Sequence, residues 1–194
     1  MKDRRTGKLV GVALAVSALG IGALAPSAQA AEDPTNVTVT GAELILGSVA
    51  IGDFGSVALD GTVNTTTATM AAFSVNDSRG SGAGWSVTIG ATEFAEWDGS
   101  AYVASGKTIG ASRTSLGNAT VAKTDETSSA VPTMTAGAYT LDAGSAVKIA
   151  SAAANGTGMG SYDITPGLVS LTVDADTYAR NYRSDVTVTL ATGP

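Results

Sequence analysis

The chain has 194 residues and a net charge of −6, and it contains neither Cys nor His. The lack of both residue types excludes a Ser–His triad, a Cys–His dyad and the usual zinc sites. An acidic chain without basic clusters also argues against nucleic acid or an anionic membrane as a partner. Without disulfides, a hydrophobic core has to stabilise the fold.

The first 30 residues have the order of a secretory signal peptide. Four basic residues stand within the first eight positions, an uncharged apolar run covers residues 9–24, and Ala28-Gln29-Ala30 forms a small-x-small cleavage site. The apolar run is shorter than the roughly 20 residues that a membrane-spanning helix needs, which favours a cleaved segment over a permanent anchor. We therefore expect a signal helix within residues 1–30 that is cleaved between Ala30 and Ala31.

Cleavage would leave a flexible leader over residues 31–36 and one domain over residues 37–194. The mature chain would carry seven Lys and Arg against sixteen Asp and Glu, which is a net charge of −9. Its length is sufficient for a single hydrophobic core. No second apolar segment of membrane length follows, so we expect no stable membrane anchor after processing.

Four segments alternate apolar and polar residues with the period of a half-buried strand. In chain order they cover residues 37–40, 85–90, 169–173 and 186–190. Turn-forming residue pairs at 60–61, 98–99 and 155–156 fall between such segments. Short strands separated by turn signals predict an all-β fold, an antiparallel two-sheet β-sandwich with Greek-key-like connections.

Two glycine-rich runs, at residues 79–84 and 156–160, have the composition of phosphate-binding loops. A phosphate loop must open a helix whose N-terminal amides hold the anion, and no helical pattern follows either run. We interpret both runs as loops in which Gly adopts unusual backbone angles or lets two chain segments approach closely.

The acidic residues offer no strong catalytic pattern. Glu93 and Glu96 lie close in sequence, as do Asp174 and Asp176, and a carboxylate pair can serve a glycosidase if the fold sets its spacing. Both pairs stand beside turns, which favours solvated acids at the rim; a calcium site at the second pair is the alternative. We expect no enzyme, and no catalytic residue, metal or cofactor.

The two tryptophans have different expected places. Trp85 alternates in register with Val87 and Ile89, which predicts a core position. Trp97 precedes the 98–99 turn; if that turn closes a two-residue hairpin, Trp97 and Tyr102 are diagonal neighbours that can stack on a sugar ring. The alternative is that Trp97 covers an open end of the core.

Two segments resemble the motifs of the WxL domain family. Residues 75–89, Val-Asn-Asp-Ser-Arg-Gly-Ser-Gly-Ala-Gly-Trp-Ser-Val-Thr-Ile, followed by Phe94, are similar to its first motif of an aspartate, Arg-Gly and a glycine-spaced Gly-Trp-x-Leu strand. Residues 182–194 are similar to its closing motif, Tyr-x-Ser-x-Leu-Thr-Trp-x-Leu. Val87 replaces the Leu of the first motif and Val188 the Trp of the second, so the pair of motif tryptophans is incomplete. The resemblance covers roughly residues 40–194.

The resemblance implies a secreted protein that attaches non-covalently to the wall of a Gram-positive bacterium, through peptidoglycan or another wall polymer. The enrichment in Ala, Gly and Thr points to an actinobacterial member. The alternative is a structural or adhesive subunit that binds other surface proteins rather than the wall itself. The motif positions carried over as candidate binding residues, which can equally be structural, are Asp77, Arg79, Gly80, Gly82, Gly84, Trp85, Val87, Tyr182, Val188 and Leu190.

Overall fold

The computed structural model describes residues 35–194, and this part of the chain is all-β. The predicted signal helix, the cleavage point between Ala30 and Ala31 and most of the predicted leader lie outside the described residues. Within the described part, no helix is long and apolar enough to cross a membrane.

The described residues form fifteen strands and two single turns of 3-10 helix. The strands are β1 Leu44–Leu46, β2 Asn64–Ala68, β3 Phe73–Asp77, β4 Trp85–Ala91, β5 Phe94–Glu96, β6 Thr108–Ile109, β7 Thr114–Leu116, β8 Thr120–Lys123, β9 Thr133–Met134, β10 Tyr139–Thr140, β11 Val147–Ala152, β12 Gly160–Thr165, β13 Val169–Val173, β14 Tyr182–Arg183 and β15 Val186–Thr192; the 3-10 turns are η1 Ala111–Arg113 and η2 Ala143–Ser145.

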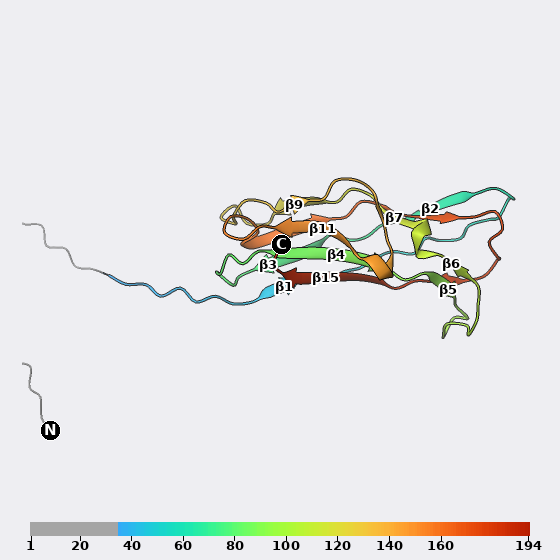
Figure 1. Cartoon of the computed structure of the whole chain (residues 1–194), viewed down its shortest axis with the longest axis horizontal. Coiled ribbons are helices and arrows are strands. Elements are labelled where there is room, and N and C mark those ends of the chain that lie inside the picture. The colour runs from blue at the N-terminus through green and yellow to red at the C-terminus, as the bar shows by residue number, and fades with distance from the viewer. Residues whose placement is uncertain (1–34) are drawn as a thin grey trace, which may run out of the picture. The chain divides into compact units, whose positions relative to one another are not determined.

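These strands make four small antiparallel sheets (Figure 1). The strand orders are β1-β3-β12-β8 in the first sheet, β10-β7-β13-β2 in the second, β15-β4-β11-β9 in the third and β14-β5-β6 in the fourth. The predicted antiparallel all-β fold is confirmed. The strands are divided among four sheets where the sequence predicted two, because several long strands are interrupted midway.

The first and second sheets share one register. Phe73 of β3 lies opposite Ile164 of β12, and Ala68 of β2 lies opposite Val169 of β13. Moving five residues back along one strand and five forward along the other leads from the first pair to the second. Both pairings therefore belong to one ladder that is broken between the two sheets.

The third and fourth sheets are joined in a similar way, with a slip of one residue. Ala91 of β4 lies opposite Val186 of β15, whereas Glu96 of β5 lies opposite Tyr182 of β14. Five steps along one strand thus correspond to four along the other. A one-residue irregularity of this kind bends a strand pair and ends regular pairing.

Two hydrophobic clusters fill the interior. The main cluster takes side chains from the first three sheets, and the rings of Trp85 and Tyr162, 6.2 Å apart at their centroids, bring β4 against β12. The second cluster is smaller and consists of Phe94, Ile109, Leu171 and Val173. It lies where the second and fourth sheets meet.

Strand β4 is buried more completely than the sequence predicted. Trp85, Val87 and Ile89 are fully buried on the core side, as their alternation predicted. Ser86 and Gly90, on the other face, are buried as well. The reason is that β4 pairs with β15 on one side and β11 on the other, so small side chains on its outer face are covered by their neighbours.

The prediction of a strand over residues 37–40 is wrong. These residues belong to no strand, and Val37 and Val39 are exposed. The first backbone pairing comes at Ala42, whose N–H donates to the Ser78 carbonyl at 2.8 Å. Alternation and strand propensity are therefore present here without a partner strand, and a strand needs a partner to satisfy its backbone groups.

Candidate functional site

The first motif builds an ion pair at the end of β3. Asp77 is only 3% exposed, and its carboxylate accepts from Arg79 twice: from Nε at 2.8 Å and from Nη2 at 2.9 Å. These hydrogen bonds lower the pKa of Asp77 below its usual value, an effect that burial of the carboxyl partly opposes. A bidentate Arg–carboxylate pair is both strong and fixed in orientation.

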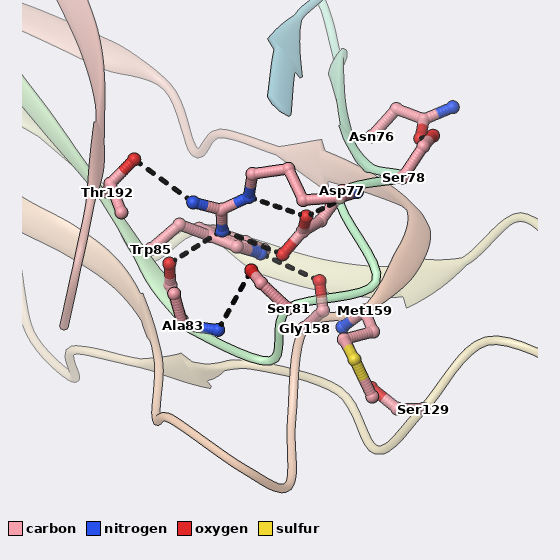
Figure 2. A network of polar contacts seen from close by, with 12 residues as sticks. Asn76, Asp77, Ser78, Ser81, Ala83, Trp85, Ser129, Gly158, Met159 and Thr192 are labelled. Atoms are coloured by element: carbon pink, nitrogen blue, oxygen red, sulfur yellow. Dashed lines mark hydrogen bonds and ion pairs between the residues drawn. The ribbon is translucent and has the colours of Figure 1, made fainter. Parts of the chain in front are cut away.

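Arg79 connects this ion pair to two other segments. Its Nη2 also donates to the Gly84 carbonyl at 2.8 Å, and its Nη1 donates to Thr192 Oγ1 at 3.0 Å, at the end of β15. The Gly193 N–H donates to the same Gly84 carbonyl at 3.2 Å. Figure 2 shows this network around Asp77, with Thr192 on the neighbouring strand. Arg79 thus holds the two motif segments together.

The glycine-rich run between β3 and β4 is a loop, as predicted. Gly80, Gly82 and Gly84 have φ values of 65°, 62° and 73°, in the left-handed region that favours glycine. A Cβ on Gly84 would also overlap the Ala152 carbonyl of β11. The motif glycines therefore serve the backbone path and close packing.

Trp85 is a core residue. Its ring is fully buried, and its Nε1–H donates to the Gly158 carbonyl at 2.8 Å, so its single polar atom is satisfied. Gly158 has a φ of 78°, and a Cβ there would lie 2.7 Å from the Trp85 Nε1. The second glycine run thus makes room for the motif tryptophan.

The remaining motif residues also have structural positions. Val87 is fully buried and lies opposite Leu190. Val188 and Leu190 are half-buried and pack against the main cluster. Tyr182 is on β14, which precedes β15 in the chain. It packs against the second cluster, and its hydroxyl donates to the Tyr178 carbonyl at 2.8 Å. Burial raises the pKa of Tyr182, with the nearby Glu96 charge adding to the effect.

Trp97, which is half-buried, and Tyr102, which is exposed, form an aromatic pair at the opposite end of the long β4–β5 segment. They lie directly opposite each other as an isolated antiparallel bridge, with ring centroids 5.1 Å apart and ring planes at 74°. The predicted pairing was a diagonal one across a two-residue turn. That detail is wrong, because the loop has four residues, 98–101, and closes with a bond from the Asp98 N–H to the Ala101 carbonyl.

The loop is held by its first side chain. Asp98 Oδ1 accepts from the N–H groups of Ser100 and Ala101, both at 2.8 Å. These backbone bonds, the one from Ala101 first, lower the pKa of Asp98. A carboxylate that satisfies the amides of the loop stabilises the longer turn, a property that the Asp98-Gly99 pair alone does not reveal.

Arg183 and Asp185 complete a cluster around these two rings. The Arg183 guanidinium lies over the Trp97 ring, 4.7 Å from its centroid, and Tyr102 donates its hydroxyl to Asp185 Oδ2 at 2.9 Å. Tyr102 is 44% exposed and Trp97 is half-buried. We call Trp97, Tyr102, Arg183 and Asp185 the aromatic cluster. It offers an aromatic surface, a cation and a carboxylate at one place.

The pairing of β5 with β14 creates this cluster, since it places Arg183 opposite Ala95, on the side of the strand where Trp97 stands two residues later. Sequence reasoning found the two aromatic residues and missed Arg183 and Asp185. Their only signal was their place within the closing motif, because the contact joins residues that are far apart in the chain.

A shallow pocket of about 390 Å³ lies beside β14. Among its lining residues, Lys107 places its ammonium 4.2 Å from the centroid of the Tyr178 ring, and Arg113 pairs with Asp174 at 2.5 Å. Glu96 pairs with Arg180 at 3.2 Å. One acid of each predicted close pair is thus engaged in an ion pair. Among the described residues, no group of three acidic side chains gathers to hold a metal ion.

A family model described as "WxL domain surface cell wall-binding" matches residues 25–194. No curated protein and no solved structure matches the chain.

Proposed function

Because this chain belongs to the WxL family of surface cell wall-binding domains, we propose that peptidoglycan is the wall polymer that it binds. The protein is a cell-surface protein that binds the cell wall. In our proposal the attachment is non-covalent, the host is a Gram-positive bacterium, and the domain binds without turning over its ligand. The sequence contains no His and no Cys, and this supports binding without turnover because the common catalytic triads and dyads use these side chains.

The aromatic cluster is the contact surface in this proposal, and the exposure of Tyr102 beside Trp97 is the observation that carries it. A glycan strand has apolar ring faces and polar edges. An exposed aromatic ring suits the faces, while the Arg183 guanidinium and the Asp185 carboxylate suit hydroxyl and amide groups. Aromatic residues and Arg are also the side chains that most often dominate binding surfaces.

The motif residues have a different role in the proposal. Asp77, Arg79 and Trp85 are buried or bonded to other parts of the domain, so they build the domain and make no direct contact with the wall. This division supports a positioning role for the motif. It also explains how Val188 can replace a tryptophan, because that position lies at the margin of the main cluster.

Sedimentation with washed peptidoglycan tests the contact surface. Tyr102→Ala should lower the affinity for peptidoglycan by about 1–3 kcal/mol, by analogy with other aromatic stacking surfaces, and should leave the melting temperature nearly unchanged. Trp85→Ala should lose binding only by unfolding, because truncation of a buried Trp costs about 3–5 kcal/mol. Parallel assays with and without teichoic acid identify the polymer.

Three outcomes would contradict this proposal. A folded Tyr102→Ala protein that sediments like the parent would remove the aromatic cluster as the contact surface. A Trp85→Ala protein that melts like the parent and no longer sediments would make Trp85 a direct contact. Binding that depends wholly on teichoic acid would show that teichoic acid, and not peptidoglycan, is the ligand.

A second candidate function, a subunit that binds other surface proteins, is favoured by the unpaired edge of β15, which within residues 35–194 pairs with β4 alone. Retention of the purified protein on wall fragments stripped of protein separates the two functions. Binding to stripped wall supports direct attachment, and binding only to wall that keeps its proteins supports the subunit.

We also propose that the four sheets stack as two layers of a Greek-key-like sandwich. The shared registers support joining the first sheet to the second and the third to the fourth, and the Trp85–Tyr162 contact supports stacking of the joined pairs. The domain would span residues 37–194 after a signal peptide, 1–30, and a leader, 31–36; an intact mass that begins at Ala31 would support the cleavage point. The comparisons do not support an actinobacterial origin, which stays a prediction.

A further inference from the structure

The edges of the four sheets differ in how they are protected. An edge strand presents unpaired N–H and C=O groups, and proteins blunt such edges with short strands, charges or covering segments. The edge strands β1, β6, β9, β10 and β14 have only two or three residues. β8 carries Lys123. The edge of β2 is covered by the segment before it, where the Gly52 N–H donates to the Thr69 carbonyl at 2.9 Å and Thr66 Oγ1 donates to the Phe54 carbonyl at 2.7 Å.

Among the described residues, strand β15 is neither short nor charged, and β1, which lies close to it, forms no backbone pairing with it. Strand β15 has seven residues, none charged and none Pro, and its backbone ladder runs to β4 alone. Val186, Val188 and Leu190 are half-buried at the margin of the main cluster, while Thr187 and Thr189 are exposed. A long, uncharged edge of this kind is a template for an added strand.

The segment that fits this edge lies in the same chain. Residues 37–40, Val-Thr-Val-Thr, repeat the Val–Thr alternation of β15 and have no partner strand in the part of the chain that the structure describes. Val37 and Val39 are 87% and 88% exposed. If residues 37–40 were added beside β15, both Val side chains would lie on the core side next to Val188, and both Thr side chains would extend the outer face.

This segment starts from the end of the domain where β15 ends. A Cβ on Gly41 would overlap the Arg79 carbonyl, so the two backbones are in close contact. Arg79 in turn donates to Thr192, the last residue of β15, at 3.0 Å. The free segment and the free edge are therefore neighbours, and in two copies facing each other both exchanges can form at once.

We propose that two copies of this chain exchange these segments, residues 37–40 of each pairing as a further strand with β15 of the other. Because the segment and the edge lie at the same end of the domain, the exchange closes into a two-fold dimer and does not continue as a filament. This interface is separate from the aromatic cluster, so the proposal does not depend on the wall ligand.

Cysteine cross-linking of the exported chain tests the pairing, since the natural sequence contains no Cys. A Thr38→Cys variant mixed with a Thr189→Cys variant should give a disulfide-linked heterodimer, because both side chains would lie on the outer face of the added pair. The matched control is Thr67→Cys, an exposed Thr on the covered edge strand β2. Cross-linking to Thr189→Cys at least about tenfold faster than to the control supports the exchange, and equal rates overturn it.

Light scattering during gel filtration supplies the second measurement. The natural chain should be a dimer, and a Thr38→Pro, Val39→Pro double variant should raise the dimer dissociation constant by at least about tenfold, because Pro removes the N–H donors on both sides of the segment. Both positions are exposed, so the melting temperature of the domain should not change. A natural chain that stays monomeric at all concentrations would refute the proposal. So would a Thr38→Cys, Thr189→Cys double variant that forms its disulfide within one chain.

Discussion

At the scale of single residues, Asp77 shows how the first motif stabilises the domain. Its carboxylate is buried, and Arg79 meets it with two hydrogen bonds while also bonding to Gly84 and Thr192. A buried ion pair is costly when one partner is removed, because the other charge is left without compensation. The motif positions are therefore explained by the stability of this junction.

The Asp77→Asn variant should show a changed dependence of stability on pH. Because Arg79 lowers the pKa of Asp77 in the folded state, this contribution to stability is present above the unfolded pKa of about 4 and is lost as the pH falls through the folded pKa. At pH 7 the free energy of unfolding of the variant should be about 3 kcal/mol lower than that of the natural chain. On acidification it should fall by less than that of the natural chain.

Urea unfolding between about pH 2 and pH 7 measures this difference. Asp163→Asn, at an exposed position of β12 without an ion pair among the described residues, is the matched control and should follow the natural chain at every pH. An Asp77→Asn protein as stable at pH 7 as that control would show that the junction contributes little.

Gly158 is the second residue with a measurable role. A Gly158→Ala change places a Cβ against Trp85 and Ala152 and also strains a positive φ, so it should cost about 2–4 kcal/mol. Gly80→Ala is the control, because Gly80 has a similar φ of 65° with no atom within 4 Å of its Cβ position. It should cost only about 1 kcal/mol. Equal losses in thermal unfolding would mean that contact with Trp85 is unimportant.

At the scale of elements, β4 is the centre of the third sheet. It is buried on both faces and pairs with β15 and β11 along its length. β8, in contrast, is an edge strand with mostly exposed residues. The difference follows from position in the sheet, since both strands have alternating or β-branched residues.

Hydrogen exchange should reveal this difference between strands. The amides of β4 should exchange only on global unfolding, because their bonds are covered on both sides, whereas those of β8 should exchange through local opening at least about tenfold faster. Exchange followed by mass spectrometry of peptides covering residues 85–91 and 120–123 measures both. Equal protection of the two peptides would indicate that the sheets open as one unit.

At the scale of the whole molecule, the family describes a cell wall-binding protein. The domain joins a junction of motif residues at one end to an aromatic cluster at the other, along the β4–β5 and β14–β15 segments. Binding at one end therefore leaves the opposite end, with the free edge of β15 and residues 37–40, available for another partner.

The purified protein should release no soluble sugar or peptide fragment from peptidoglycan. General acid–base catalysis of glycoside cleavage needs two carboxyl groups facing one bond, and here Glu96 and Asp174 are engaged in ion pairs with Arg180 and Arg113. Chromatography of the supernatant after incubation with labelled wall measures release, with a muramidase as the positive control. Release that saturates with substrate would identify an enzyme.

The sequence by itself determined the all-β class, the core position of Trp85 and the loop character of the glycine runs, because side-chain alternation and glycine backbone freedom are local properties. Its motifs were also sufficient to identify the family. Two predictions from local sequence were wrong. Residues 37–40 have a strand pattern but no partner among the described residues, and at the predicted two-residue turn 98–99 the Asp98 side chain stabilises a longer loop.

The tertiary structure alone decided which residues meet. The Arg79 bond to Thr192, the stacking of Arg183 on Trp97 and the space that Gly158 leaves for Trp85 all join residues far apart in the chain. Such contacts follow from strand register and sheet order, and a period-two pattern specifies neither, because it gives each strand a buried face without naming its neighbour. For the same reason, only the folded chain distinguishes buried motif residues from the exposed aromatic cluster.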